Sequence, residues 1–531
     1  MQSNMGVMEN MNMAAGGSFD DLPMDWVGNW VGRWARVAPG RTAILDAGNG
    51  RAFDYSDLDR RANRLANRLT DDFALARGDR VCMLLRNRIE AVDLYLACGK
   101  AGIILAPLSY RLRPRELNDL MARIQPGLLV AEDTFDDLVG ELEYPRPKPA
   151  MLRIADDGGY EQGLESSSDA EANTALAMSD TFLYIHTGGT TATPKVCVVP
   201  YRQMVWNSFD LMVCGGGTLD SRELITFPLF HVGGWNSLTP ILHGGGYAVL
   251  TRQFDPGQLL DLVAEERIRH FGAVEAMLRM VLAHPRFEQA DLSSLERVTT
   301  AGAPCAEPVM RAFHDRGIAI TQAYGLTEAG PSNFIHAPVD QTHDEIWRHN
   351  RSIGTAMPHC DYRIVDRETR EPLPAGETGV LCMRSMHNFA GYLGQPERTA
   401  QALLDDGWVY SGDLAMEDDE GYVHIVGRAD NMFISGGENV SPEEIEDVLM
   451  RRPGVQQAAV VAVDDERWGQ VAVAAVVAEH AVEELRAGLL ELCRQELAGY
   501  KVPRRIEFMD ALPVTGAGKI DRNAIRARIS G

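Results

Sequence analysis

Residues 181–200, TFLYIHTGGTTATPKVCVVP, place a loop of small and hydroxyl-bearing residues between two apolar runs. The runs TFLYI and VCVV are typical of β-strands. In the loop, glycines let backbone N–H groups approach an anion, threonine hydroxyls add donors, and Lys195 adds positive charge. No GKS or GKT sequence follows, so this is not a Walker A loop. The stretch predicts a phosphate-binding turn, and an ordinary polar hairpin turn remains the alternative.

The composition excludes several classes of function. The chain has 531 residues, with 51 Lys and Arg against 75 Asp and Glu, and its formal charge is −24. Nucleic-acid binding is not expected, because affinity for phosphates depends on basic residues. No window approaches the roughly 18 consecutive apolar residues of a membrane-spanning helix. The length corresponds to about three to four structural units.

The cysteines and the first residues predict the cellular compartment. The 8 cysteines are scattered singly without a CxxC pair, which favours free thiols in a reducing cytoplasm. Residues 1–18 lack both the basic and the apolar region of a signal peptide, and their Met, Asn and Gly bias predicts a disordered leader.

Strand-like and helix-like patterns alternate along most of the chain. The runs VCMLL and GLLVA lie on either side of helical patterns, and the alternation resumes from residue 183 to about 341, which predicts parallel α/β layers. The acidic, Gly- and Ser-rich segment 156–179 predicts a solvated linker. RIVD, GVLCMRS and YVHIVGR predict strands of a smaller unit. SPEEIEDVLM then predicts a helix with a capping box formed by Ser441 and Glu444, within a final α+β module.

Three further segments carry residue types that nucleotide chemistry uses. TQAYGLTE (321–328) offers an aromatic face, a hydroxyl and a carboxylate that could bind Mg²⁺. YSGD (410–413) places an acid after a glycine turn, where it can bind the hydroxyls of a ribose. LPVTGAGKI (512–520) carries one lysine on a glycine loop. Taken singly, each segment has another explanation that is as good or better. TQAYGLTE can be a strand end, the acid of YSGD a solvated charge, and the lysine of LPVTGAGKI a surface lysine.

In this order and spacing, the four segments resemble the motifs of the adenylate-forming superfamily: acyl-CoA synthetases, peptide-synthetase adenylation domains and luciferases. The stretches QAYGLTEAGPSNF and NMFISGGENVSPEEIE are most similar to the bacterial fatty and aryl acyl-CoA synthetase branch. The resemblance implies an α/β fold in which an N-terminal adenylation domain (19–427) contains two α/β layered subdomains and a small β-barrel-like subdomain. A hinge (428–430) and a smaller, mobile α+β C-terminal domain (431–531) would follow.

The resemblance also implies the reaction, an AMP-forming acid:CoA ligation. A carboxylate would attack the α-phosphorus of ATP, with Mg²⁺ as cofactor, and coenzyme A would then displace AMP from the acyl-adenylate. The implied partners are therefore a small carboxylic acid, ATP and coenzyme A, with no nucleic acid and no transmembrane segment, and a homodimer is compatible with the family.

The matching positions imply roles for individual residues. Lys519 would stabilise charge during attack on the α-phosphorus, Glu328 would bind Mg²⁺, and Thr327 would bind the α-phosphate. The remaining nucleotide-binding positions are Thr187, Gly189, Thr190, Thr191 and Lys195 for the phosphates, Gly302, Ala303, Pro304, Tyr324 and Gly325 for adenine, and Asp413 and Arg428 for the ribose. Thr190 and Lys195 also count as catalytic. Asp430 matches the hinge, and Gly436 the wall of the coenzyme A tunnel.

The acyl pocket is implied less specifically. His231 matches a position that lines the acyl site and gates the thiol, and Val232, Gly233, Trp235, Ala301 and Ser332 would lie near it. Core packing explains Trp235 equally well. No Asp lies between Phe227 and Pro240, which argues against an amino-acid substrate and favours a mainly apolar fatty or aryl acid.

The chain also departs from the family pattern. Gly188, Ala192 and Val196 replace a serine and two glycines of the usual loop. Because of this difference, a catalytically silent protein that binds ATP or acyl-AMP remains an alternative function. Two further alternatives are an enzyme that loads an acyl-carrier protein and a luciferase-like oxygenase. Retention of both Lys519 and Glu328 favours a ligase.

Overall fold

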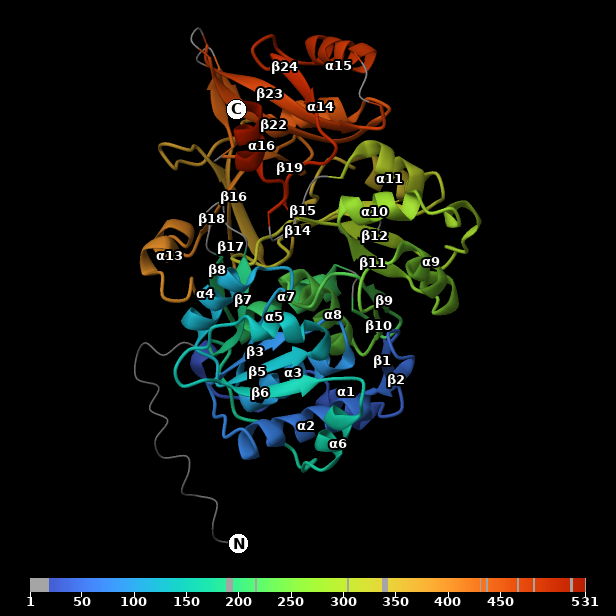
Figure 1. Ribbon diagram of the computed structural model, residues 1–531, viewed down its shortest axis with the longest axis vertical. Coiled ribbons are helices and arrows are strands. Elements are labelled where there is room, and N and C mark those ends of the chain that lie inside the picture. The colour runs from blue at the N-terminus through green and yellow to red at the C-terminus, as the bar shows by residue number, and fades with distance from the viewer. Residues whose placement is uncertain are drawn as a thin grey trace.

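Three α/β or α+β parts and a small antiparallel sheet make up the computed structural model (Figure 1). The structure describes residues 19–187, 194–214, 217–302, 305–336, 342–429, 431–435, 438–465, 468–480, 483–515 and 519–530. The C-terminal part lies at the top of the view, and two α/β lobes lie below it.

The first lobe contains a six-stranded sheet that is parallel except for its last pair. Its strands, in spatial order, are β6 (Ala150–Ile154), β5 (Leu128–Glu132), β3 (Arg80–Leu84), β4 (Ile104–Pro107), β7 (Thr181–Thr187) and β8 (Lys195–Pro200). The helices that follow or precede these strands are α2 (Tyr55–Asp71), α3 (Ile89–Ala101), α4 (Pro114–Ile124), α5 (Asp136–Gly140), α6 (Gly159–Glu165) and α7 (Tyr201–Val213). Every residue of α3 is buried, as expected for a helix enclosed between layers.

The second lobe contains a seven-stranded sheet with one antiparallel edge strand. Its strands, in order, are β13 (Ala319–Gln322), β12 (Arg297–Thr300), β11 (His270–Ala273), β9 (Arg222–Ile225), β10 (Tyr247–Leu250), β1 (Thr42–Asp46) and β2 (Arg51–Asp54). The associated helices are α1 (Gly32–Val37), α8 (Val232–Gly244), α9 (Pro256–Glu265), α10 (Glu275–Leu282), α11 (Glu307–His314) and α12 (His343–Arg348). Both lobes therefore have the α/β layering that the sequence predicts.

The smaller unit expected to be barrel-like is a four-stranded antiparallel sheet with β16 and β19 at its edges. Its strands are β16 (Cys360–Val365), β17 (Gly379–Ser385), β18 (Val409–Glu417) and β19 (Val423–Arg428), with α13 (Pro396–Ala402) between β17 and β18. A two-stranded ribbon of β14 (Phe334–Ile335) and β15 (Thr355–Ala356) leads into it.

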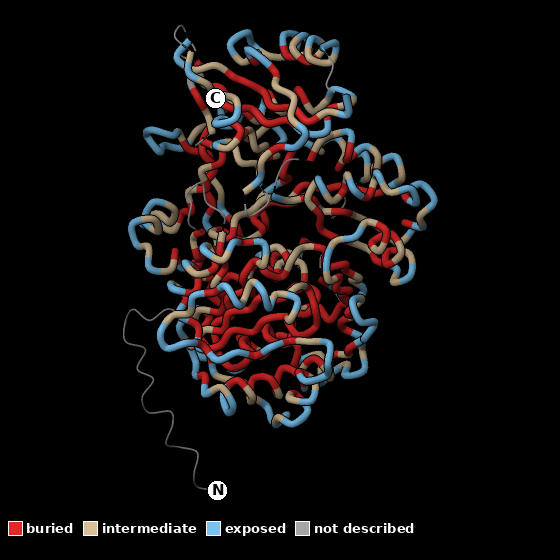
Figure 2. Tube along the Cα trace, in the orientation of Figure 1, coloured by how far each residue is buried: buried red, intermediate tan, exposed pale blue. Residues whose placement is uncertain are grey.

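The C-terminal part packs helices on a five-stranded sheet, which agrees with the expected small α+β domain. The strands are β20 (Phe433–Ser435), β21 (Glu438–Val440), β22 (Val455–Asp465), β23 (Gly469–Ala478) and β24 (Arg505–Phe508), and the helices are α14 (Pro442–Met450), α15 (Glu483–Glu496) and α16 (Arg522–Ser530). A buried cluster that includes Ile445, Leu489 and Ile506 joins the sheet to α14 and α15. Figure 2 shows this buried layer separately from the buried interiors of the two lobes.

Two local expectations are wrong. The capping box does not form, because the Ser441 hydroxyl donates to the Val426 carbonyl (2.7 Å) and Glu444 pairs with Lys501 (2.7 Å). The predicted linker 156–179 contains α6, and the Tyr160 hydroxyl of that helix donates to buried Asp93 (2.9 Å).

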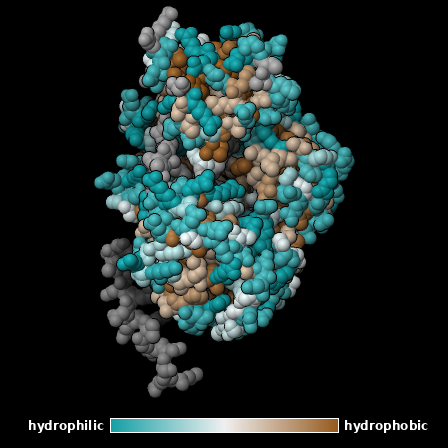
Figure 3. All heavy atoms as spheres, viewed as in Figure 1, coloured by the Kyte–Doolittle hydropathy of each residue, from teal (hydrophilic) through white to brown (hydrophobic). Residues whose placement is uncertain are grey.

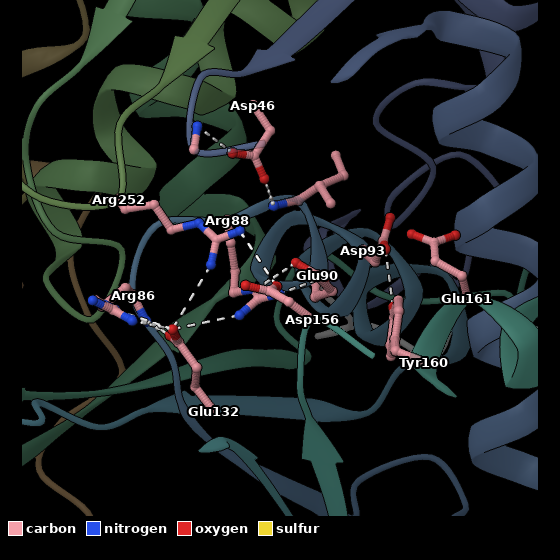
Figure 4. Close-up of polar contacts among 12 residues, drawn as sticks. Asp46, Arg86, Arg88, Glu90, Asp93, Glu132, Asp156, Tyr160, Glu161 and Arg252 are labelled. Atoms are coloured by element: carbon pink, nitrogen blue, oxygen red, sulfur yellow. Dashed lines mark hydrogen bonds and ion pairs between the residues drawn. The ribbon is translucent and has the colours of Figure 1, made fainter. Parts of the chain in front are cut away.

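A cluster of ion pairs lies where strands of both sheets end, and Arg252 connects it to the second lobe (Figure 4). Glu132, the last residue of β5, is 1% exposed and lies 2.5 Å from Arg86 of its own lobe and 3.8 Å from Arg252, which comes from the β10 end of the other sheet. Arg88 adds bonds to Glu90 (2.6 Å) and Asp156 (2.9 Å). A junction of this kind fixes one lobe against the other, because separating a buried pair leaves uncompensated charges.

All 8 cysteines are free thiols in buried positions. Of the helices in the described ranges, none has both the length and the apolar character needed to cross a membrane.

Candidate active site

The hairpin of β7 and β8 carries the first predicted motif. Thr187 and Lys195 are directly paired at the turn end of the hairpin, and the two predicted flanking strands are therefore confirmed. Gly189, Thr190 and Thr191, together with the altered positions Gly188 and Ala192, lie outside the described residues.

Glu328, Lys195 and Tyr392 meet beside this hairpin. The Tyr392 hydroxyl donates to Glu328 Oε1 (2.7 Å), and Lys195 Nζ lies 4.8 Å from the centre of the Tyr392 ring. Burial, followed by the Glu328 charge, raises the pKa of Tyr392, so the phenol stays protonated and keeps donating. The structure thus brings the predicted metal-binding carboxylate close to the predicted phosphate-binding lysine.

Tyr324, Asp413 and Arg428 form a second group from three different segments. The Tyr324 hydroxyl donates to Asp413 Oδ2 (2.5 Å), and Arg428 Nη1 donates to Asp413 Oδ1 (2.8 Å). Asp413 and Arg428 are paired residues of β18 and β19. The arrangement joins the aromatic ring predicted for adenine to the carboxylate predicted for ribose.

Two glycines near the ends of β12 and β13 have opposite surroundings. Gly302 has φ +85°, and a Cβ built there would meet no atom within 4 Å, so open space adjoins the backbone. A Cβ at Gly325 would lie 2.0 Å from the Pro331 carbonyl oxygen, so only glycine fits this close approach. Ala301 is half-buried, and Ala303 and Pro304 lie outside the described residues.

Polar bonds from α7 and α8 hold the segment that follows Gly325. Gln203 donates to the Thr327 carbonyl (2.7 Å), Asn207 donates to the Ser332 carbonyl (2.8 Å), and Asn236 donates to the Ser332 hydroxyl (2.9 Å). Thr327 and Ser332 are buried.

The predicted acyl residues divide into two groups. Val232 and Gly233 begin α8 directly after His231. The surface of the molecule is hollowed between the C-terminal part and the lobes (Figure 3). Trp235 is fully buried and stacks on Tyr95 at 4.2 Å with an interplanar angle of 5°. The second of the two interpretations of Trp235, core packing, therefore accounts for its position.

Lys519 lies on a turn of the C-terminal domain. Desolvation by the surrounding protein, followed by the positive charges of Lys519 and Arg111, lowers the pKa of His231 to about 4, although the residue is exposed at the surface. The lysine therefore acts electrostatically on a residue of the second lobe, 288 positions earlier in the chain. Asp430 and Gly436 lie outside the described residues.

Three residues of this site were missed from the sequence. His186 precedes Thr187 in β7, its Nε2 accepts from the Ser109 N–H (3.0 Å), and burial together with His231 lowers its pKa to about 4. Arg111 follows β4, and Tyr392 holds Glu328. Only His186 carried a signal, its place beside the phosphate-binding loop.

The site offers few carboxylates, which suits Mg²⁺ because this ion does not need a cage made of protein ligands alone. Mg²⁺ is usually held by one or two carboxylates together with substrate phosphates, and Glu328 offers one. The cluster His314, His343 and Asp344 is a separate candidate among the described residues. Its two imidazole rings are stacked 4.0 Å apart at an angle of 6°, and parallel rings cannot both direct an in-plane lone pair at one ion.

Comparisons with known proteins agree with this geometry. Residues 31–393 match the family model described as AMP-binding enzyme, and residues 444–519 match its C-terminal domain. A feruloyl-CoA synthase from Amycolatopsis sp is 36% identical over 503 residues, which cover 94% of this chain and 99% of that protein. An indoleacetate–CoA ligase from Aromatoleum aromaticum is 35% identical over 514 residues, covering 94% and 98%.

A solved structure is also similar over nearly the whole length. ATP-bound MatB from Rhodopseudomonas palustris superimposes with a TM-score of 0.86 at 28% identity, covering 94% of this chain and 98% of that one. The first family model spans the segments that hold Lys195 and Glu328, and the second ends on Lys519. The chain therefore belongs to the AMP-binding enzyme family of adenylate-forming proteins.

Proposed function

We propose that the protein is an AMP-forming acid:CoA ligase. In the first step a carboxylate oxygen attacks the α-phosphorus of ATP, the bond to the β-phosphate oxygen breaks, and pyrophosphate leaves. In the second step the coenzyme A thiolate attacks the acyl carbonyl and AMP leaves. Family membership and the two relatives named as CoA ligases support this reaction.

The geometry around Glu328 carries the proposal, because its carboxylate is held by the Tyr392 hydroxyl (2.7 Å) and Lys195 Nζ lies 4.8 Å from the centre of the same ring. Lys519 acts electrostatically on His231, which supports a C-terminal cation near the same site. A preorganised cation stabilises the charge that develops on the phosphoryl oxygens during in-line attack. His231 is neutral near pH 7, so it adds no second charge at this place and is suited to line the acyl side.

The nucleotide would be held by the two groups described above. Tyr324 and Gly325 would contact adenine, Asp413 and Arg428 the ribose, and Thr187, Thr327 and Lys195 the phosphates. Mg²⁺ bound by Glu328 would neutralise part of the phosphate charge.

The acid is proposed to be mainly apolar beyond its carboxylate, of the aryl or fatty class. The names of the feruloyl and indoleacetate relatives favour an aryl acid. We also propose a cytoplasmic enzyme with an N-terminal domain over 19–427, a hinge at 428–430 and a C-terminal domain from 431 that rotates between the two steps, with Gly436 then lining the thiol tunnel.

Pyrophosphate release with a panel of aryl and fatty acids tests this function. The wild-type enzyme should release pyrophosphate with at least one acid, and Lys519→Ala should lower that rate by about 100-fold or more, as loss of a transition-state charge contact does. Wild-type release by Lys519→Ala, or silence across the panel, would refute the ligase. Loss of free coenzyme A thiol distinguishes it from an enzyme that loads a carrier protein.

A further inference from the structure

Lys519 sits on a turn whose two legs are joined by backbone hydrogen bonds. Thr515 N donates to the Lys519 carbonyl (2.7 Å), and Asp521 N donates to the Pro513 carbonyl (2.8 Å). The legs therefore move as one unit, and the direction in which Lys519 points depends on what holds that unit to the rest of the domain.

The first leg is anchored by apolar burial. Leu512, at its start, is 6% exposed and packs in a cluster with Val461 of β22 and Ile525 of α16. Such contacts hold the leg against the sheet but impose little direction, because apolar packing has no preferred bond angle.

The second leg is anchored by a charged pair. Arg522, three positions after Lys519, begins α16, and its Nη2 donates to both carboxylate oxygens of Glu446 at 2.7 and 2.8 Å. Glu446 belongs to α14 and also accepts from the Val460 N–H of β22 (2.6 Å), while Glu443 lies 3.4 Å from the same guanidinium. One carboxylate thus joins α14, β22 and the helix that leaves the lysine turn.

We propose that Glu446 and Arg522 are positioning residues that aim the Lys519 turn into the active site for the adenylate-forming step. This inference rests on the proposed function. Directional bonds from a buried carboxylate fix a guanidinium in both place and orientation. A catalytic cation that is displaced by about 1 Å can lose about 100-fold in rate, so an anchor three residues away affects the chemistry.

The same helix supplies a matched control. Glu444, two positions before Glu446, pairs with Lys501 Nζ at 2.7 Å through both oxygens. Lys501 leads into β24 and has no bond to the lysine turn among the contacts of the described residues. Glu444→Gln and Glu446→Gln therefore remove the same charge from the same helix, and only the second loosens α16.

The experiment measures the two half-reactions separately in the full-length enzyme. Adenylate formation is followed as pyrophosphate release without coenzyme A, and thioester formation is followed from supplied acyl-adenylate and coenzyme A. Glu446→Gln should slow adenylate formation by about 10-fold or more and leave thioester formation within about twofold, because only the first step uses Lys519. Glu444→Gln should leave both within about twofold. Arg522→Lys should lie between wild type and Glu446→Gln, because lysine keeps the charge but lacks the planar guanidinium that fixes the orientation of the pair.

Thermal unfolding of each variant separates positioning from stability. Equal loss in both half-reactions with a lowered Tm would show a merely structural pair and overturn the proposal. Wild-type adenylate formation by both Glu446→Gln and Arg522→Lys would overturn it as well. If Lys519→Ala forms adenylate at the wild-type rate, the proposed function itself is refuted. The Lys519→Ala variant alone therefore distinguishes this failure from a failure of the positioning proposal.

Discussion

At the scale of single residues, Tyr392 orients Glu328, the proposed metal ligand. Its hydroxyl donates to Glu328 Oε1 at 2.7 Å. Tyr392→Phe removes this donor and leaves the carboxylate less firmly oriented, so we expect about a 10-fold rise in the Mg²⁺ concentration needed for half-maximal pyrophosphate release. Titration of the rate with Mg²⁺ measures this change. Tyr144→Phe, which loses only a bond to the Val139 carbonyl, is the control, and an unchanged Mg²⁺ requirement in Tyr392→Phe would contradict this role.

Residues that share a motif could be related from the sequence, and residues that meet only through the fold could not. The strands on either side of the loop from Thr187 to Lys195 could be predicted because the turn between them is local, and both residues prove to be strand ends. Tyr392 reaches Glu328 across 64 positions, from a segment with no motif of its own. Its contact follows from the backbone pairing of residues 391–393 with β8, where Tyr392 lies opposite Cys197, and neither periodicity nor spacing records that pairing.

At the scale of elements, composition predicted the alternating layers but misjudged α6. Segment 156–179 is rich in polar residues, which favours a linker, yet Tyr160 is 3% exposed and its helix contacts α2 through Glu161 and Arg61 (2.7 Å). The polar residues of α6 form pairs with residues of α2 and α3, and these pairs exist only in the folded protein. Similarly, the Ser441 hydroxyl donates to a backbone carbonyl of β19, and this tertiary contact replaces the expected local helix cap.

The buried bond between α6 and α3 makes a measurable contribution to stability. Tyr160→Phe removes the donor to Asp93, a fully buried carboxylate that also pairs with Arg61 (2.7 Å). We expect the free energy of unfolding to fall by about 1.5–3 kcal/mol, the usual range for a bond to a charged group. Urea unfolding at neutral pH measures this difference. Tyr500→Phe, at a 37% exposed position, should change it little, and an equal effect of the two variants would refute the assignment.

At the scale of the whole molecule, the pKa of His231 reports how the C-terminal domain sits on the lobes. Desolvation by the surrounding protein, Lys519 and Arg111 lower this pKa to about 4, so the imidazole is neutral above about pH 5 and takes up its proton only as the pH falls further. Removing a nearby positive charge favours the protonated form, and Lys519→Ala should therefore raise the pKa of His231 while desolvation keeps it below the ordinary 6.5. NMR titration of labelled histidine, assigned with His231→Gln, measures the change. Lys501→Ala, which removes a cation paired with Glu444 in the same domain, should leave the pKa in place. No difference between the two lysine variants would mean that the C-terminal domain does not present Lys519 to the acyl site in solution.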